Sequence, residues 1–220
     1  MRWLRLRALL TVNLVLFFVF MIGVLLTGHA HENDELAEHG EPTQSLVEYA
    51  GSSSFGETVF ENWESEFLQM GMYVLLTAFL VQKGSAESKP IDTPAEQDED
   101  PRDHRDDPKA PWPVRHGSEL VLRLYENSLA IAFGAVFLLS FWLHAWTGAG
   151  AYNEEQQQHG GEVVSAWQYV TTSQFWFESF QNWQSEFLAV AAIVGGSIFL
   201  RQRNSAQSKP VHAPHSETGG

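Results

Sequence analysis

The chain has 220 residues, with 13 Lys and Arg, 27 Asp and Glu and no Cys, which gives a formal net charge of −14. The lack of thiols excludes disulfides, Cys-ligated metals and cysteine nucleophiles. The acidic balance argues against a nucleic-acid partner, because binding to phosphates needs clustered Lys and Arg. A hydrophobic content of 44% would suit a soluble protein, so the distribution of apolar residues decides the class.

Four apolar segments follow one another along the chain. The first, at 8–26, contains no charged residue and has 19 residues, close to the number of about 20 that crosses the hydrocarbon core of a bilayer as a helix. The others lie at about 63–82, 128–146 and 183–201. The remaining sequence is too polar to bury four such segments in water. The sequence therefore predicts an all-α polytopic membrane protein with four transmembrane helices.

The second half of the chain repeats the first at an offset of 120 residues. Residues 55–90 then align with 175–210 without a gap, and 17 of the 36 positions are identical. The same offset aligns the first apolar segment with the third, which is internal, so we expect the first to remain a membrane helix rather than a cleaved signal peptide. Each copy holds two helices, so both copies enter the membrane in the same orientation. The fold class expected is two parallel, tandem-duplicated helical hairpins.

The repeat also divides the chain into regions. Repeat 1 spans 1–83 and repeat 2 spans 118–210. Between them, 84–117 holds six of the nine prolines and an acidic run, and this composition predicts a disordered cytoplasmic linker. Residues 211–220 are expected to form a disordered tail.

The basic residues predict the orientation in the membrane. All 13 lie in the N-terminal segment, in the linker and its flanks, or in the C-terminal tail, and none lies in 27–66 or 147–186. Basic loops stay in the cytoplasm, so both termini and the linker are predicted to be inside, in a multi-pass protein of the inner (plasma) membrane. The two outer segments hold 15 of the acidic residues.

One nine-residue motif, F-[EQ]-N-W-[EQ]-S-E-F-L, occurs at 60–68 and again at 180–188. Helical spacing places its aromatic residues on one face and its polar residues on the next. The predicted aromatic anchors are Phe60, Trp63, Phe67, Phe180, Trp183 and Phe187. The predicted interfacial or ion site consists of Asn62, Ser65, Glu66, Asn182, Ser185 and Glu186.

Two interpretations of the motif stay open. In the first, the aromatic residues belong to the outer interfacial belt and the carboxylates face headgroups and water. In the second, the pseudo-two-fold axis brings Glu66 and Glu186 together, with the amides of Asn62 and Asn182 beside them. Paired carboxylates and amide oxygens suit a hard cation, and close like charges suit a shared proton.

Other chemistry has little support in the sequence. His29, His31 and His39 stand among acidic residues in the first outer segment, but flexible acidic loops usually stay solvated, so no metal site is predicted. No P-loop, dinucleotide fingerprint, nucleophile elbow or H-E-x-x-H motif is present. We expect no catalytic residue, no cofactor and no enzymatic activity.

Four sequence features together resemble a known family. They are the duplicated motif, the S-A-x-S-K-P helix exits at 85–90 and 205–210, N-E-E-Q-x-x-H-G at 153–160 and R-L-Y-E-N-S-L at 123–129. The chain resembles a bacterial membrane-protein family catalogued only as a domain of unknown function, which implies four membrane helices and no assigned activity.

The function expected is a non-catalytic structural or accessory role in the cell envelope. The alternative is a small cation- or proton-handling transporter or channel that uses Glu66 and Glu186. The expected partners are the lipid bilayer and either further copies of the chain or an envelope protein, with no nucleic acid.

Overall fold

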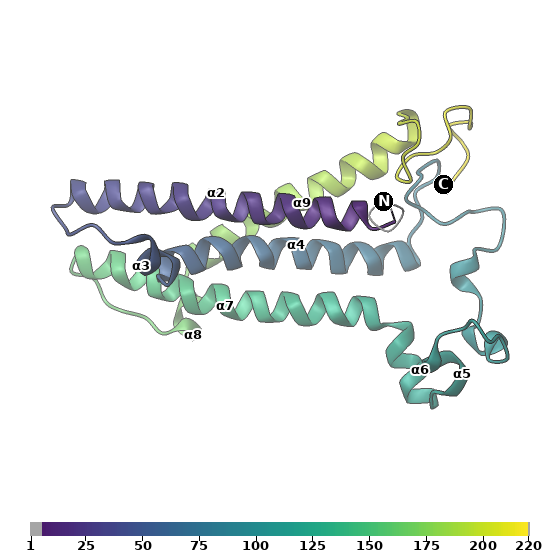
Figure 1. The fold of residues 1–220 in the computed structure, drawn as a ribbon, viewed down its shortest axis with the longest axis horizontal. Coiled ribbons are helices and arrows are strands. Elements are labelled where there is room, and N and C mark those ends of the chain that lie inside the picture. Colours follow the sequence, from purple (N-terminus) through teal and green to yellow (C-terminus); the bar gives the residue numbers. More distant parts are fainter. Residues whose placement is uncertain (1–5, 220) are drawn as a thin grey trace. The chain divides into compact units, whose positions relative to one another are not determined.

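A computed structural model of the chain describes residues 6–219, and within this range the chain forms helices and no strand (Figure 1). Four helices are long: α2 (Ala8–Glu38), α4 (Ser53–Phe79), α7 (Ser128–Gln158) and α9 (Ser173–Phe199). The short ones are α3 (Leu46–Ala50), η1 (Glu96–Asp98), η2 (Pro101–His104), α5 (Trp112–His116), α6 (Glu119–Glu126) and α8 (Ala166–Tyr169). Arg2 and Arg5 of the basic N-terminal segment and Gly220 of the tail lie outside the described residues.

The long helices begin and end at positions that differ by the 120-residue offset of the sequence repeat. The α4 and α9 helices begin ten residues before the predicted spans at 63–82 and 183–201 and end slightly earlier, at Phe79 and Phe199. The hydroxyls of Ser88 and Ser208 explain these ends, since they accept hydrogen bonds of 3.0 and 2.9 Å from the backbone N–H groups of Gln82 and Gln202. The S-A-x-S-K-P segment thus folds back on the helix exit in each copy.

Two helices, α2 and α7, are long and apolar enough to cross a membrane. The α4 and α9 helices are not among them, because the polar N-W-x-S-E sequence occupies part of each. The all-α class is thus confirmed, while the spans of α4 and α9 stay a prediction.

The chain forms two compact units that do not coincide with the sequence repeats. Unit 1 comprises 1–60 and 142–175, and unit 2 comprises 61–141 and 176–220. The buried apolar side chains of unit 1 are those of Tyr49, Ala145, Ala149, Tyr169 and Phe175. Those of unit 2 are Ala95, Val114 and Leu122, none of which belongs to α4 or α9.

In unit 1, the loops after α2 and α7 are held by equivalent contacts in the two copies. Gly40 and Gly160 have φ values of +73° and +71°, a left-handed conformation that ends a helix without the steric penalty of a Cβ. The side chains of Asn33 and Asn153 then each form two hydrogen bonds of 2.7–3.0 Å with the backbone N–H and carbonyl of one loop residue, Gln44 and Val164 respectively. Each of these loops is therefore held by its own copy of the repeat.

Two glycines of unit 1 admit the rings of buried tyrosines. A Cβ on Gly28 would lie 2.2 Å from the hydroxyl oxygen of Tyr49, and a Cβ on Gly148 would lie 2.5 Å from the Cε1 atom of Tyr169. Both tyrosines are almost completely buried. Gly28 and Gly148 therefore allow α3 and α8 to approach α2 and α7 closely.

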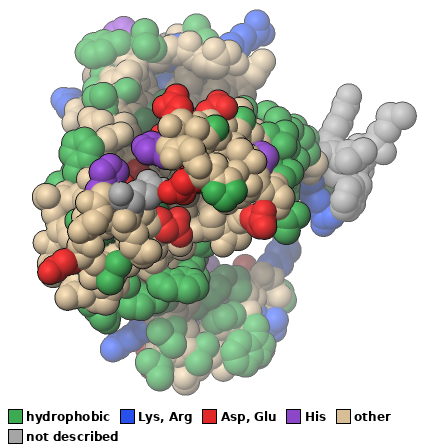
Figure 2. Space-filling model, turned by 90° about the vertical axis from the view of Figure 1, so that its left-hand side faces the viewer, with side chains coloured by type: hydrophobic (Ala, Val, Ile, Leu, Met, Phe, Trp, Pro, Cys, Tyr) green, Lys and Arg blue, Asp and Glu red, His purple; other side chains and the backbone are tan. Residues whose placement is uncertain are grey.

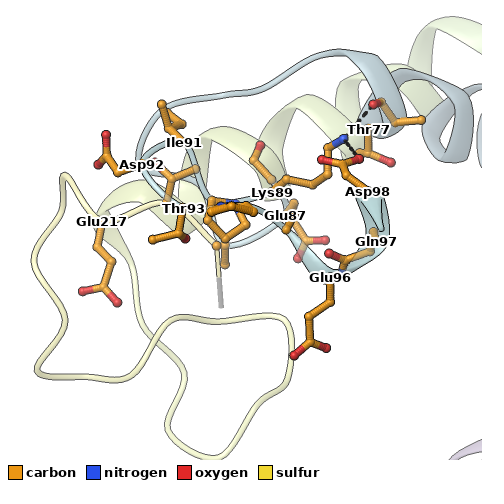
Figure 3. A pocket seen from close by; sticks show the side chains of 18 of the residues that line it. Thr77, Glu87, Lys89, Ile91, Asp92, Thr93, Glu96, Gln97, Asp98 and Glu217 are labelled. Carbon is orange, nitrogen blue, oxygen red and sulfur yellow. Dashed lines mark hydrogen bonds and ion pairs between the residues drawn. The ribbon is translucent and has the colours of Figure 1, made fainter. Parts of the chain in front are cut away.

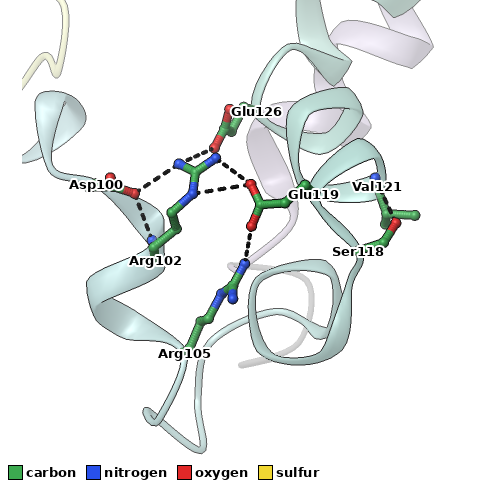
Figure 4. Close-up of polar contacts among 7 residues, drawn as sticks. All are labelled: Asp100, Arg102, Arg105, Ser118, Glu119, Val121 and Glu126. Atoms are coloured by element: carbon green, nitrogen blue, oxygen red, sulfur yellow. Dashed lines mark hydrogen bonds and ion pairs between the residues drawn. The ribbon is translucent and has the colours of Figure 1, made fainter.

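In unit 2, the segment between the repeats is held by surface ion pairs (Figure 4). Arg102 contacts Glu119 at 2.8 Å and Asp100 at 3.1 Å, and Arg105 contacts Glu119 at 2.7 Å. Hydrogen bonds from Arg102, and then from Arg105, lower the pKa of the Glu119 carboxyl. Exposed pairs of this kind contribute little to stability. The disorder predicted for 84–117 accordingly stays a prediction for solution measurements to decide.

The C-terminal segment of unit 2 folds around a buried lysine. The Lys209 ammonium, whose side chain is buried, donates hydrogen bonds to the carbonyl oxygens of Pro214, His215 and Glu217 at 2.8–3.2 Å. Burial lowers the pKa of Lys209. The backbone N–H of Gly219 donates to the Ser85 carbonyl at 2.9 Å, which connects the tail to the exit of α4.

We expect Gly28→Ala and Gly148→Ala to lower the free energy of unfolding by about 1–3 kcal/mol each, the usual cost of overpacking a close contact. The tyrosine ring, or the helix that carries it, must move to admit the new Cβ. Gly23→Ala in α2 is the matched control, because no atom lies within 4 Å of its added Cβ. Thermal unfolding in detergent measures the difference, and equal effects of Gly28→Ala and Gly23→Ala would contradict the close-contact explanation.

Candidate functional site

The N-terminal parts of α4 and α9 bring the two copies of the nine-residue motif into contact in unit 2. The side chain of Glu64 is completely buried. The indole N–H of Trp183 donates a 3.1 Å hydrogen bond to its Oε1 atom. A buried carboxylate needs such a donor, because removing it from water costs on the order of several kcal/mol.

A second contact between α4 and α9 involves the preceding turn of α4. The Asn182 side-chain amide donates a hydrogen bond to the carboxylate of Glu61, which is half-buried. The same amide lies 3.3 Å from the carbonyl of Glu178 on its own helix. Asn182 and Trp183 of copy two thus meet Glu61 and Glu64 of copy one.

Equivalent polar residues of the two motif copies differ in their exposure. Ser65 is buried whereas Ser185 is exposed, although each hydroxyl donates a 2.8 Å hydrogen bond to the carbonyl three residues earlier, at Asn62 and Asn182. Glu66 is exposed and Glu186 is half-buried. The copies therefore share backbone geometry but not side-chain environment.

The predicted aromatic anchors form contacts of different kinds. Trp183 packs edge-on against Phe180 and Trp176, with ring centroids 5.5 and 6.2 Å apart. Phe67 lies 6.1 Å from Phe133 of α7. Phe180 and Phe187 stay exposed, while Phe60 and Trp63 are half-buried. Trp183 is thus both an aromatic anchor and the donor to Glu64.

Sequence reasoning missed the two carboxylates that the structure places at this contact. Glu61 and Glu64 occupy the variable positions of the motif, where copy two has Gln181 and Gln184. This difference between the copies is the sequence feature that indicates the contact, because only copy one is charged at these two positions. The predicted site is based instead on Glu66 and Glu186, which are identical in the two copies.

The buried side chains of α4, α9 and the first part of α7 in unit 2 are polar. Besides Glu64 and Ser65, they are those of Gln69, Ser140, Ser179 and Ser197. The Ser179 hydroxyl has no hydrogen-bond partner among the described residues. By contrast, many large apolar side chains of these helices are exposed, including Leu75, Leu138, Ile193 and Phe199. These parts of the three helices therefore have buried polar and exposed apolar side chains, the reverse of the usual distribution in a soluble protein.

Unit 1 contains a further group of buried polar side chains around α7. His144 is completely buried, and its ring stacks on Phe175 with a centroid distance of 4.7 Å. The Tyr169 hydroxyl donates a 3.2 Å hydrogen bond to Glu57 Oε1. At the equivalent positions of the other copy, His144 corresponds to Val24 and Glu57 to Phe177.

The C-terminal ends of α2 and α7 and the loops after them present an acidic surface, where Asp, Glu and His side chains gather (Figure 2). Burial and the nearby Glu32 raise the pKa of Glu154, whereas a hydrogen bond from Ser54 at 2.9 Å holds Glu32. Each histidine considered for metal binding has a protein partner, and His31 contacts the Glu35 carboxylate at 3.5 Å. His29 contacts the Gln44 carbonyl at 2.8 Å, and His39 contacts the Glu35 carbonyl at 2.8 Å.

Comparison with known proteins identifies one family. A family model described as Domain of unknown function (DUF6766) matches residues 1–220. No curated protein and no solved structure matches the chain.

We expect Trp183→Phe to lower the free energy of unfolding by about 1–3 kcal/mol, because buried Glu64 loses a hydrogen-bond donor while the ring is retained. The double variant with Glu64→Gln should lose less than the sum of the single variants, as contacting residues do in a double-mutant cycle. Trp146→Phe is the control, since Trp146 is largely exposed. Additive effects in the cycle would show that the indole and the carboxylate do not stabilise each other.

Proposed function

The chain belongs to the family Domain of unknown function (DUF6766), and we propose that it is a four-span protein of the inner membrane with a non-catalytic structural or accessory role. Both termini and the linker are cytoplasmic in this proposal. Lipid surrounds the four long helices, and the acidic outer segments face away from the cytoplasm.

The observation that carries the proposal is the exposure of α2. Its apolar side chains from Leu9 to Leu26 are largely exposed, and the most apolar 18-residue window of the helix has no buried residue. A surface of this kind is far larger than the apolar patches that soluble monomers expose. Lipid tails are the environment in which it costs no free energy.

The four-span arrangement is supported by the repeat and by the exposed apolar residues of α4 and α9. Their outer parts carry the polar motif, but their inner parts expose Leu75, Leu76, Phe79, Ile193 and Phe199. Copies with identical helix boundaries are expected to have the same topology. A bilayer that accommodates α2 and α7 would then accommodate α4 and α9 as well.

The structural role is supported by the contacts between α4 and α9. Helices in lipid gain little from the hydrophobic effect, so hydrogen bonds such as those of Glu61 with Asn182 and Glu64 with Trp183 favour a defined association. The acidic loops that this assembly presents outside offer a surface for an envelope protein or for further copies of the chain.

Labelling of single cysteines tests the topology, and the natural chain contains no Cys that would have to be removed. In intact cells, a membrane-impermeant maleimide should label Glu41→Cys and Glu162→Cys. Asp106→Cys and His212→Cys should react only after permeabilisation. If only α2 and α7 crossed the membrane, position 106 would be labelled from outside and position 162 would not, which would contradict four spans.

A second candidate function, cation or proton handling at the outer surface, is favoured by the carboxylates of Glu66 and Glu186, which occupy equivalent positions of the two copies. A hard cation between two carboxylates would relieve their repulsion. No basic residue of 27–66 or 147–186 competes for this position.

For this candidate, we expect the purified protein to bind Ca²⁺ with a dissociation constant of about 10⁻⁴–10⁻³ M, the range of weak extracellular sites. Glu66→Gln and Glu186→Gln should each weaken binding, and the double variant should abolish it in titration calorimetry. Glu38→Gln, which changes one outer carboxylate elsewhere, is the control. Unchanged binding in the double variant would exclude the pair as the site.

A further inference from the structure

Polar side chains recur at every fourth residue along α4, from its outer part to its inner end. They are Glu61, Ser65, Gln69, Tyr73 and Thr77, and each is buried or half-buried. Residues four apart on a helix are neighbours, separated by about 6 Å along the axis. The series therefore covers about 24 Å, most of the roughly 30 Å thickness of a hydrocarbon core. We call these five residues the α4 polar track.

The outer end of the track lies at the contact with α9. Glu61 and Glu64 receive hydrogen bonds from Asn182 and Trp183 there. Ser179 lies one turn before Trp183, on the same face of α9, and its buried hydroxyl has no partner among the described residues. Buried polar groups without a protein partner are usually bonded to ordered water. Two carboxylates and the Ser179 hydroxyl thus lie at this end.

Gln69 occupies the middle of the track. Its side chain is 9% exposed, and within the described part of the chain no hydrogen bond reaches its amide. Among the described residues, the buried atoms without a partner include the Ser179 hydroxyl oxygen but not the Gln69 amide, so this amide reaches the molecular surface, where water is its available partner. With Ser65 and Tyr73 about 6 Å away on either side, single waters span the steps by two ordinary hydrogen bonds.

The inner end of the track opens into an acidic pocket of about 1040 Å³ (Figure 3). The Tyr73 hydroxyl donates a 2.9 Å hydrogen bond to Glu87 Oε2, and both Glu87 and Thr77 line the pocket. The other carboxylates that line it are those of Asp92, Glu96, Asp98 and Glu217. Lys89 is paired with Asp98 at 2.6 Å.

Comparison of the copies indicates that packing does not require the track. At the equivalent positions α9 has Gln181, Ser185, Ala189, Ile193 and Ser197. The third and fourth positions are therefore apolar in copy two, where the same helix boundaries are kept. Polar residues inside a membrane helix that the fold does not need are expected to serve function.

We propose that the α4 polar track is a hydrated path for protons between the outer carboxylates Glu61 and Glu64 and the acidic pocket at Glu87. A proton from outer water binds a carboxylate and then passes to the waters held by Ser65 and Gln69. Tyr73 accepts it while it gives its own phenolic proton to Glu87, which releases it to the pocket. One proton crosses, and no group is oxidised or reduced. The proposal rests on the four-span topology proposed above.

Proton flux into liposomes tests the path. The full chain is reconstituted, a K⁺ gradient with valinomycin sets an inside-negative potential, and an internal pH-sensitive dye reports acidification. We expect flux above that of protein-free liposomes. Gln69→Leu and Tyr73→Phe should each reduce it about tenfold or more, the size of effect that loss of one hydrogen-bonded step gives. Met70→Leu, on the adjacent exposed position of α4, is the control and should keep the wild-type flux.

Two results would overturn the proposal. One is wild-type flux equal to that of protein-free liposomes, and the other is unchanged flux in folded Gln69→Leu and Tyr73→Phe. Circular dichroism and gel filtration of each variant show that it is folded, and Tyr73→Phe preserves the ring if Gln69→Leu does not fold. The cysteine labelling described above reports topology separately, so four confirmed spans without flux would reject the path and leave the membrane assignment intact.

Discussion

A carboxylate that has lost its water needs a hydrogen-bond donor, and Glu64 obtains one from the indole of Trp183. This requirement sets the relation of α4 to α9 in unit 2. Once Trp183 faces Glu64, Asn182 meets Glu61 on the previous turn of α4. Ser179 and Glu186 are then directed to the same face, since they lie four residues before and three residues after Trp183. The polar interior of unit 2 follows from this one contact, and the apolar side chains are left to face outward.

The duplication has kept some features in both copies and changed others in one. The loop clamps of Asn33 and Asn153, the left-handed Gly40 and Gly160 and the serines at the helix exits are present twice with nearly equal geometry. These features form the helical hairpins. Several buried or half-buried polar side chains are present in one copy only, among them those of Glu57, Glu64, Gln69, Tyr73 and His144. The contacts that form the hairpins thus occur in both copies, whereas these polar side chains occur in one.

The sequence predicted the all-α class and the offset of the repeat well, because 17 identities at one spacing and long apolar segments are strong signals. It predicted the ends of α4 and α9 less well, since these depend on hydrogen bonds that the hydroxyls of Ser88 and Ser208 accept from backbone N–H groups across a turn. The candidate site was predicted only in part. The prediction of an ion site at Glu66 and Glu186 depends on their identity in the two copies. The burial of Glu64 instead depends on which side of α4 contacts α9. The packing of α4 on α9 is a tertiary contact. Helical spacing alone assigns Glu64 neither to the aromatic face nor to the polar face of the motif.

The contact of copy one acids with copy two amides has a consequence for the origin of the chain. Glu61 and Glu64 of copy one accept hydrogen bonds from Asn182 and Trp183 of copy two. The equivalents of the two acids in copy two, Gln181 and Gln184, are neutral and exposed. Joining the hairpins in one polypeptide allows the two sides of the contact to differ, so that one copy supplies the acids and the other supplies the donors.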